Sequence, residues 1–172
     1  MVSEEVFFAR IRAAINARRQ SGGDIVIIAR TDALASLSLE AAITRLRKAI
    51  SIGADVAFLE GIRSREEGEA VVHELRPIPV LFNMAHGGVT ASISVEEAQN
   101  WGFRMIIFPT FALNEVYKSV MKGFQRLRTE GNVPYDQKKG DPTLKQMFEV
   151  CGLQESMDFD TMAGGDMYSK GV

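Results

Sequence analysis

The run DIVIIARTDA, residues 24–33, constrains the fold more than any other stretch of the chain. Its apolar part, residues 25–29, leads without a gap into Arg30, Thr31 and Asp32. An apolar run of this length is typical of a strand that is buried on both faces, as in a parallel sheet. Polar residues at the exit of such a strand lie where α/β proteins place their binding and catalytic groups.

Three further apolar runs follow the first at similar intervals. They begin at residues 55, 78 and 104, so successive runs begin 31, 23 and 26 residues apart. The segments between them carry apolar residues at helical spacing, and Ser64 and Ser94 open two of these segments with the spacing of a capping box. This alternation predicts an α/β fold in which βα units repeat on a parallel sheet. We predict strands at 25–29, 55–60, 78–83 and 104–109, and helices at 3–20, 38–52, 64–75, 94–101, 114–129 and 143–150.

The predicted βα units occupy residues 1–131, and residues 132–172 form a second segment. This segment begins with a polar loop at 132–141 and continues with the short predicted helix at 143–150. Beyond Gly152 the chain is acidic and contains several glycines and methionines, so we expect a tail that is loosely ordered or is ordered only against a neighbouring chain. We expect the second segment to make contacts between copies of the chain.

Composition argues against several classes of protein. Apolar residues make up 46% of the 172 residues, which is ordinary for a globular protein with a hydrophobic core. The net charge of −2 and the scattered basic residues argue against nucleic-acid and membrane binding. Cys151 is the only cysteine, so an internal disulfide cannot form. The sequence shows no signal-peptide pattern and no apolar run of membrane-spanning length, and we predict a cytoplasmic protein.

Each predicted strand ends in polar or turn-forming residues, and the strand ends of an α/β barrel converge on one mouth. An arginine there can hold a carboxylate through two parallel hydrogen bonds. A glutamate can orient the arginine or accept a proton, and adjacent glycines let backbone N–H groups approach an anion. We predict Glu60 and His86 as catalytic residues. The predicted substrate-binding residues are Arg30, Thr31, Asp32, Asn83, Gly87, Gly88 and Thr110.

Each candidate also has a purely structural explanation. Arg30 could form an ion pair with Glu60 or Asp32 that only stabilises the rim of the sheet. Asn83 could cap a loop, and His86 could be a surface residue without a catalytic role. The chain has no cysteine and histidine cluster with metal-ligand spacing, no phosphate-binding glycine loop and no nucleophile elbow. The residues alone therefore leave the chemistry open.

The order of motifs resembles the isocitrate lyase/phosphoenolpyruvate mutase superfamily. The matching stretches are IIARTDA, GADVAFLEG, PVLFN with a Gly-rich loop after it, and GFRMIIFPT. The resemblance is closest to the branch with dimethylmalate lyase, oxaloacetate hydrolase and methylisocitrate lyase. It implies a (β/α)8 barrel that binds Mg²⁺ and a 2-oxo or 2-hydroxy carboxylate, and that makes or breaks a C–C or P–C bond through an enolate. By motif match, Arg30 would bind substrate, Glu60 would lie near metal and substrate, and Asn83 would contact the substrate carboxylate.

The chain resembles only the C-terminal half of that barrel. Barrels of this type have eight strands, whereas four are predicted here. The metal-holding aspartates of the family and its gating loop with the catalytic cysteine belong to the first half and do not occur in this sequence. Mg²⁺ is therefore a cofactor by resemblance, while its usual ligands are absent. We predict half of a TIM-type barrel with four parallel βα units, a C-terminal helix and a loose tail.

A four-stranded parallel sheet that is open at both edges leaves backbone groups unpaired and one face exposed. The simplest cover is a second copy of the chain, and we predict a homo-oligomer, either a dimer or a tetramer. The resemblance implies that C-terminal helices can be exchanged between copies. The apolar strand residues that we expect to need cover are Val26, Ile28, Leu59, Leu81 and Ile106.

Three functions stay open at this point. The chain could keep the lyase reaction of the family on a small carboxylate, with metal ligands supplied from elsewhere. It could be a repurposed, metal-independent cyclase, isomerase or hydrolase of a secondary pathway that uses Arg30, Glu60 and His86. It could also be a half-barrel that binds a metabolite or a protein partner without catalysis.

Overall fold

The computed structural model describes residues 1–85 and 87–166. The chain divides into two compact units, Met1–Tyr117 and Lys118–Val172. The first unit holds the sheet, and the second consists of helical segments. The sequence places a boundary at residue 131 because a glycine ends a predicted helix there, whereas the boundary between the two compact units falls inside that helix.

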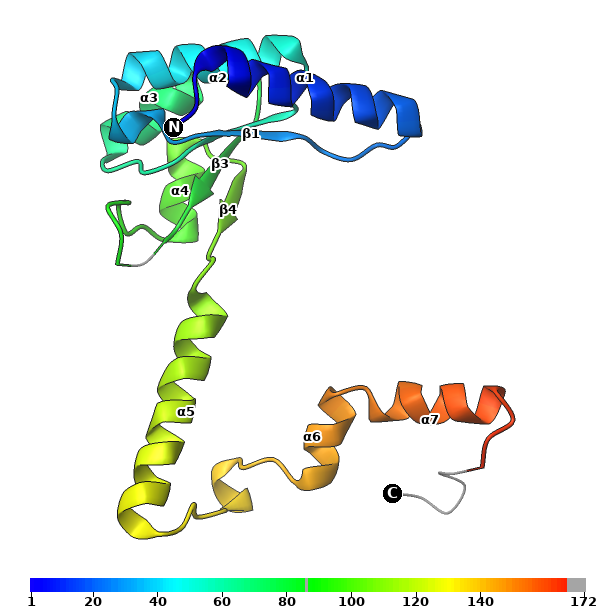
Figure 1. The fold of residues 1–172 in the computed structure, drawn as a ribbon. Coiled ribbons are helices and arrows are strands. Elements are labelled where there is room, and N and C mark those ends of the chain that lie inside the picture. The colour runs from blue at the N-terminus through cyan, green and yellow to red at the C-terminus, as the bar shows by residue number, and fades with distance from the viewer. Residues whose placement is uncertain (86, 167–172) are drawn as a thin grey trace. The chain divides into compact units, whose positions relative to one another are not determined.

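The first unit contains a parallel four-stranded sheet with the strand order β1-β2-β3-β4 (Figure 1). Each strand pairs with the strands that precede and follow it along the chain, so each connection is one βα unit. This confirms the predicted α/β fold with four parallel βα units. The strands are β1 (Ile28–Thr31), β2 (Val56–Leu59), β3 (Val80–Asn83) and β4 (Met105–Ile107).

Serine side chains fix where the first four helices begin, because each accepts a hydrogen bond from a backbone N–H in the first turn. The capping residues are Ser3, Ser38, Ser64 and Ser94. The predicted capping box is complete at Ser94, whereas at the start of α3 the side chain of Glu67 binds Arg63 instead. The helices are α1 (Glu4–Ser21), α2 (Leu39–Ile52), α3 (Arg65–Glu74) and α4 (Val95–Trp101), and a 3-10 turn, η1 (Ala33–Ala35), follows β1.

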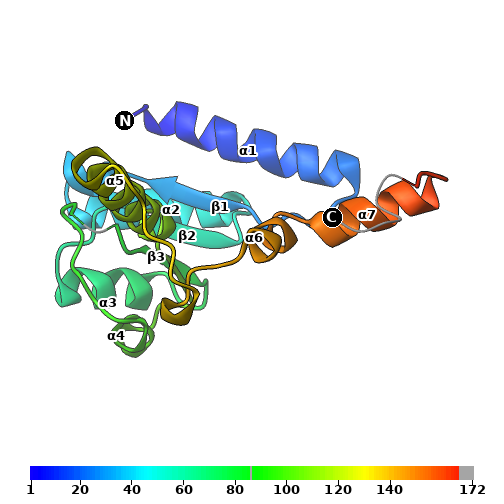
Figure 2. The same ribbon diagram turned by 90° about the horizontal axis from the view of Figure 1, so that it is seen from below.

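The main core lies between one face of the sheet and helices α1 to α4. Helices α3 and α4 lie side by side against this face (Figure 2). Phe82 of β3 is fully buried, and its ring centroid lies 6.2 Å from that of Trp101 and 5.0 Å from that of Phe103. Leu59 is buried in the same core and Ile106 packs against it. The expectation that these two residues need cover from another chain is therefore wrong, because the helices of the same unit cover them.

The opposite face of the sheet carries a small apolar cluster that consists of strand residues. Val56, Phe58 and Leu81 are buried there, and Met105 packs against them. No described helix residue belongs to this cluster. The face that would line the inside of a barrel is therefore less covered than the face that contacts the helices.

The first strand is buried on one face rather than on both. Ala29 is fully buried, whereas Ile28 is 41% exposed and Val26, which precedes the strand, is 60% exposed. The prediction of burial on both faces is wrong for this strand, because no second layer of the same unit packs on its outer row of side chains. A continuous apolar run is typical of strands that are covered on both faces. Here only one face of β1 is covered by the described residues.

The second unit consists of helical segments in which the described side chains lack a core. Helix α5 (Phe111–Glu130) begins in the first unit, and η2 (Gln137–Lys139), α6 (Leu144–Val150) and α7 (Leu153–Met162) follow. None of the residues in α5, α6 or α7 is buried. Helix α6 confirms the helix predicted at 143–150. No helix in the described part of the chain is long and apolar enough to cross a membrane.

Helix α7 occupies the first part of the predicted loose tail. Gly152 adopts a left-handed conformation with φ of 85° and separates α6 from α7. In the first turn of α7, the Gln154 side chain donates a hydrogen bond to the Asp158 carboxylate at 2.8 Å. The tail prediction is wrong here because the glycines that suggested it, Gly164 and Gly165, lie beyond the end of the helix.

We predict that Phe82→Ala destabilises the protein by about 3–5 kcal/mol, because it leaves a cavity between two aromatic rings in the main core. Equilibrium urea unfolding can be followed by fluorescence, since Trp101 is the only tryptophan and lies beside the substituted residue. Leu37→Ala is the control, because Leu37 is 52% exposed and its truncation should change stability by less than about 0.5 kcal/mol. Equal effects of the two substitutions would contradict this assignment of the core.

An ion pair between Arg18 of α1 and Asp55 connects the segments that precede β1 and β2. The Asp55 carboxylate pairs with Arg18 and accepts a hydrogen bond from the Ile27 N–H at 2.8 Å. Arg18 also donates to the carbonyl oxygens of Ile25 and Gly53. The Ile27 N–H, followed by the Arg18 guanidinium, lowers the pKa of Asp55. A lowered pKa means that the ionised carboxylate stabilises the folded chain.

We predict that Asp55→Asn costs more stability at neutral pH than in acid. The folded-state pKa of Asp55 lies below its unfolded value of about 3.9, so its contribution is complete above that value and is lost as the pH falls through the folded-state pKa. Urea unfolding of both proteins from about pH 7 down to about pH 2 measures the difference. Arg19→Met, at an exposed neighbour of Arg18, controls for removal of a helix charge. A difference between wild type and Asp55→Asn that is independent of pH would refute the prediction.

Candidate functional site

Three of the predicted site residues meet at the carboxyl ends of the first three strands. Arg30 belongs to β1, Glu60 follows β2 and Asn83 ends β3. The Arg30 Nη2 atom lies 3.2 Å from Oε2 of Glu60. The Asn83 side-chain amide donates to both carboxylate oxygens of Glu60, at 3.3 Å and 3.2 Å. Parallel pairing places these strand ends at one edge of the sheet, and Glu60 joins the other two side chains there.

Asp32 and Phe58 hold the arginine from two further sides. The Arg30 guanidinium donates to both oxygens of Asp32, at 2.9 Å and 3.1 Å, which is the bidentate arrangement of an arginine and a carboxylate. The guanidinium carbon lies 5.0 Å from the centroid of the Phe58 ring. The hydrogen bonds to Asp32, together with the negative charge of Glu60, raise the pKa of Arg30 above its ordinary value. Arg30 is thus a fixed positive charge that remains about half exposed.

Two side-chain oxygen atoms, one at the end of β3 and one in the segment after β4, are buried without a hydrogen-bond partner among the described residues. They are Oδ1 of Asn83 and Oγ1 of Thr110. The orientation of the Asn83 amide follows from chemistry, because only its NH₂ group can donate to the Glu60 carboxylate, so the carbonyl oxygen points elsewhere. A buried polar atom without a partner costs about 1–3 kcal/mol. A ligand with hydrogen-bonding groups would remove this cost.

The remaining predicted site residues are less closely connected to the cluster. Thr31 is buried on the helix-facing side of β1, and its hydroxyl accepts a hydrogen bond from the Ala33 N–H at 3.3 Å. Gly88 donates its N–H to the Ala85 carbonyl, and Gly87 has a positive φ of 81° that fits glycine in this turn. The structure therefore gives Thr31 and Gly88 local structural contacts. His86 lies outside the described residues.

A cavity of about 280 Å³ adjoins the cluster and shares Asp32 and Glu60 with it. Three of its walls come from different connections, namely the turn after β1, the turn after β2 and the loop after β3. Its lining is Asp32, Leu34, Ala35, Glu60, Gly61, Arg63 and Val89.

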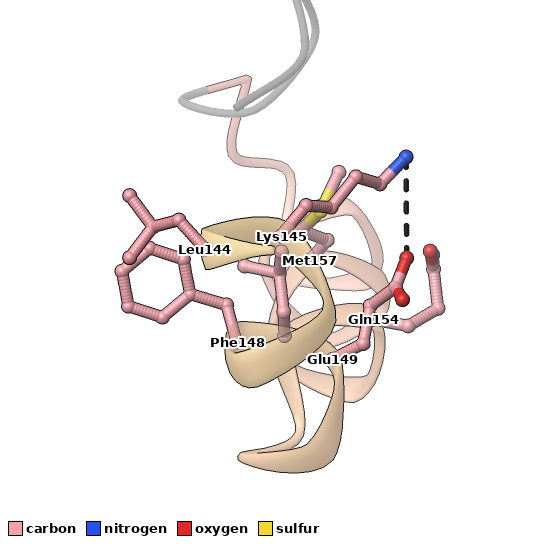
Figure 3. A pocket seen from close by; sticks show the side chains of 7 residues that line it. Leu144, Lys145, Phe148, Glu149, Gln154 and Met157 are labelled. Carbon is pink, nitrogen blue, oxygen red and sulfur yellow. Dashed lines mark ion pairs between the residues drawn. The ribbon is translucent and has the colours of Figure 1, made fainter. Parts of the chain in front are cut away.

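A second cavity of about 330 Å³ lies within the second unit, between α6 and α7 (Figure 3). Lys145 and Glu149 form an ion pair of 3.9 Å on one side of it, and Phe148 and Met157 contribute apolar surface. None of the predicted site residues lines this cavity. Its lining is Leu144, Lys145, Phe148, Glu149, Leu153, Gln154 and Met157.

The described residues provide an incomplete set of ligands for Mg²⁺. Among residues 1–85 and 87–166, no three side chains of histidine, cysteine, aspartate or glutamate are grouped to hold a metal ion. Mg²⁺ prefers six oxygen ligands but commonly keeps several waters and takes one or two carboxylates. Asp32 and Glu60 are available carboxylates, although both pair with Arg30. These residues fit contact with Mg²⁺ through water and do not fit a complete inner shell.

Sequence reasoning missed Phe58 and the apolar wall of the adjoining cavity. Phe58 precedes Glu60 by two positions, so strand alternation alone would have placed both side chains on one face of the sheet. Leu34, Ala35 and Val89 carry no comparable signal, because they come from three separate positions in turns and loops. Only the folded chain brings them to one cavity.

Comparison with known proteins identifies the family of this chain. The sequence model of the family described as phosphoenolpyruvate phosphomutase matches residues 1–128. The 2-methylisocitrate lyase of Bacillus subtilis (strain 168) is 32% identical over 148 residues, which cover 86% of this chain and 48% of that protein. The 2-methylisocitrate lyase of Salmonella typhimurium (strain LT2) is 34% identical over 131 residues, 76% of this chain and 43% of that protein.

Solved structures give the same result. A crystal structure of 2,3-dimethylmalate lyase matches with a TM-score of 0.93 and 44% identity, and the match covers 100% of this chain and 56% of that one. Oxaloacetate acetylhydrolase in complex with 3,3-difluorooxalacetate matches with a TM-score of 0.90 and 43% identity, over 98% of this chain and 56% of that one. The chain thus spans about half the length of the relatives it matches. It belongs to the phosphoenolpyruvate phosphomutase family, within the superfamily that the sequence motifs indicate.

Proposed function

We propose that this chain forms the carboxylate-binding half of a lyase that cleaves a C–C bond in a 2-oxo or 2-hydroxy dicarboxylate through an enolate. The observation that carries the proposal is the cluster in which Glu60 joins the Arg30 guanidinium to Asn83, whose carbonyl oxygen is buried without a hydrogen-bond partner among the described residues. The hydroxyl oxygen of Thr110, which follows β4, is a second buried oxygen of this kind. These groups match a ligand that combines a carboxylate with hydroxyl or carbonyl oxygens. The names of related proteins of known structure, which refer to dimethylmalate and oxaloacetate, support the same ligand class, because the first is a 2-hydroxy and the second a 2-oxo dicarboxylate.

Arg30 would bind a carboxylate of the ligand. Its planar guanidinium suits two parallel hydrogen bonds, and stacking on Phe58 limits the directions in which it can point. Asp32 occupies the two donors in the free protein, but its side chain is 54% exposed, so an incoming carboxylate can replace it. Binding would therefore exchange one carboxylate for another on the Arg30 guanidinium, namely that of Asp32 for that of the ligand.

Asn83 and Thr110 would contact the oxygens at the reacting carbon. The Asn83 carbonyl oxygen accepts a hydrogen bond, which suits the hydroxyl of a 2-hydroxy acid, while the Thr110 hydroxyl can donate to an oxygen that gains charge in an enolate. Glu60 would orient Arg30 and Asn83 and would accept a proton from the ligand. When bound, Mg²⁺ would supply a positive charge near the enolate oxygen, with Asp32 and Glu60 in contact through water.

We predict that Arg30→Met weakens binding of malate roughly tenfold to 100-fold, because it removes charge-assisted hydrogen bonds while keeping much of the packing on Phe58. Isothermal titration in the presence of Mg²⁺ measures the dissociation constant. Arg65→Met is a matched control, since Arg65 forms an exposed ion pair with Glu69 on α3 outside the cluster. Binding that Arg30→Met leaves unchanged would rule out this role for the arginine.

Release of a 2-oxo acid from substituted malates, measured with a coupled dehydrogenase, then separates catalysis from binding alone. The proposal expects turnover by the wild-type protein and its loss in Glu60→Gln. Binding of malate without turnover of any tested dicarboxylate would contradict catalysis by this chain and would leave only the carboxylate-binding role of the proposal.

We also propose that the chain works as a homo-oligomer, a dimer or a tetramer. Helix α5 exposes apolar side chains at the spacing of one helical face, and no described residue of that helix is buried. A monomer that leaves such a stripe in water is unusual, and a second copy offers a matching stripe. The residues of this stripe are Leu113, Val116, Val120, Phe124 and Leu127, which are between 48% and 67% exposed.

We predict a molar mass of two or four times the 19.0 kDa of one chain in size-exclusion chromatography with light scattering. The double substitution Val120→Glu and Phe124→Glu should reduce that mass, because two buried carboxylates at an apolar interface are costly. Gln125→Glu adds charge at a neighbouring position outside the stripe and serves as control. A folded wild-type monomer would refute the oligomer.

A further inference from the structure

We propose that the cavity beside Arg30 is a subsite that receives an apolar side group of the bound dicarboxylate, and that Ala35 and Val89 set the size of that group. The inference rests on the proposed function, because it presupposes a carboxylate on Arg30. It goes further by giving the cavity a chemical preference and by naming residues that decide specificity. The cavity shares Asp32 and Glu60 with the cluster, so a ligand held by Arg30 lies at its border.

The charges around the cavity disfavour a second carboxylate there. Asp32 and Glu60 present negative charge, and Arg30, which pairs with both, is not part of the lining. Arg63 is the cation that lines the cavity, and it is occupied by Glu67, which takes a hydrogen bond from the Arg63 N–H at 2.8 Å and pairs with its guanidinium at 2.7 Å. An anionic group would therefore meet carboxylates without gaining a free cation.

The remaining walls favour an apolar group. Leu34 is 4% exposed and forms a fixed wall, whereas Ala35 is exposed and Val89 is 73% exposed at the open side. The volume of about 280 Å³ far exceeds the roughly 30 Å³ that one water occupies in the liquid, so a methyl or ethyl group fits without displacing the walls. Covering Val89 with such a group would remove apolar surface from water on both partners.

Backbone contacts hold the loop of Val89 over this cavity. The Ala91 N–H donates to the Ile62 carbonyl at 3.0 Å and ties the loop after β3 to the turn after β2. Gly61 has a φ of 79°, and a Cβ atom there would lie 3.6 Å from Cγ2 of Val89. The valine therefore sits directly beside the turn that carries Glu60. These contacts place the Val89 side chain at the open side of the cavity, beside the turn after β2.

The test compares three ligands by isothermal titration against the wild-type protein with Mg²⁺, namely malate, 2-methylmalate and 2-ethylmalate. Each added methylene that is buried should tighten binding by about fourfold. Val89→Phe and Ala35→Leu fill the cavity from two different connections and should each abolish the preference for the alkylated ligands. Val89→Ala enlarges the cavity and should shift the preference toward 2-ethylmalate. Val6→Phe, an equivalent substitution at an exposed position of α1, should leave the ratio of the three dissociation constants unchanged.

The outcomes separate this inference from the function on which it rests. If the wild-type protein binds none of the three ligands, the proposed function fails and the subsite fails with it. If malate binds but alkylation brings no gain, the subsite alone is refuted. The same holds if the gain persists in both Val89→Phe and Ala35→Leu, because the alkyl group must then lie elsewhere.

Discussion

The parallel register of β1 and β2 is the constraint on which the rest of the site depends. It aligns Arg30 with Phe58 and Thr31 with Leu59, so the arginine stacks on the aromatic ring of its neighbouring strand. One further residue along the second strand brings Glu60 within 3.2 Å of the same guanidinium. A shift of one residue would turn each of these side chains to the helix-covered face. The hydrophobic packing of Ala29, Ala57 and Leu59 under the helices resists such a shift. The core therefore fixes the positions of Arg30, Phe58 and Glu60 on the opposite face.

Much of the fold was predictable because the local signals agree with one another. Four apolar runs, the serine caps and the helix-ending glycines indicate the same alternation of strands and helices, and the sheet follows that order. The joining of Arg30, Glu60 and Asn83 was predictable too, because strand ends of a parallel sheet share one edge. The faces of the strands were harder to assign. An apolar run gives no alternation, so Leu59 and Ile106 could be assigned to the open face although helices cover them.

The partners of the site residues escaped prediction because they depend on exact geometry. Thr31 lies between Arg30 and Asp32 in the sequence, yet its hydroxyl turns toward the Ala33 N–H. Val89 and Leu34 line one cavity although they lie far apart in the sequence, and the hydrogen bond from the Ala91 N–H to the Ile62 carbonyl ties the loop of Val89 to the turn after β2. In the second unit, a loose tail was predicted where the structure has helix α7. The prediction was based on glycines that follow the end of this helix.

The arrangement around Arg30 has a consequence for the thermodynamics of ligand capture. One guanidinium faces two carboxylates, those of Asp32 and Glu60, so the cluster carries an excess of negative charge before any ligand arrives. A dicarboxylate that enters this field adds to the excess, and the electrostatic cost falls only if a cation or a proton is taken up in the same event. The affinities for the anion and for the cation would then be linked, and each ligand would change the affinity for the other by the same factor. If the site binds such a ligand, its occupancy would depend on the concentrations of cations and protons as well as on the concentration of the ligand.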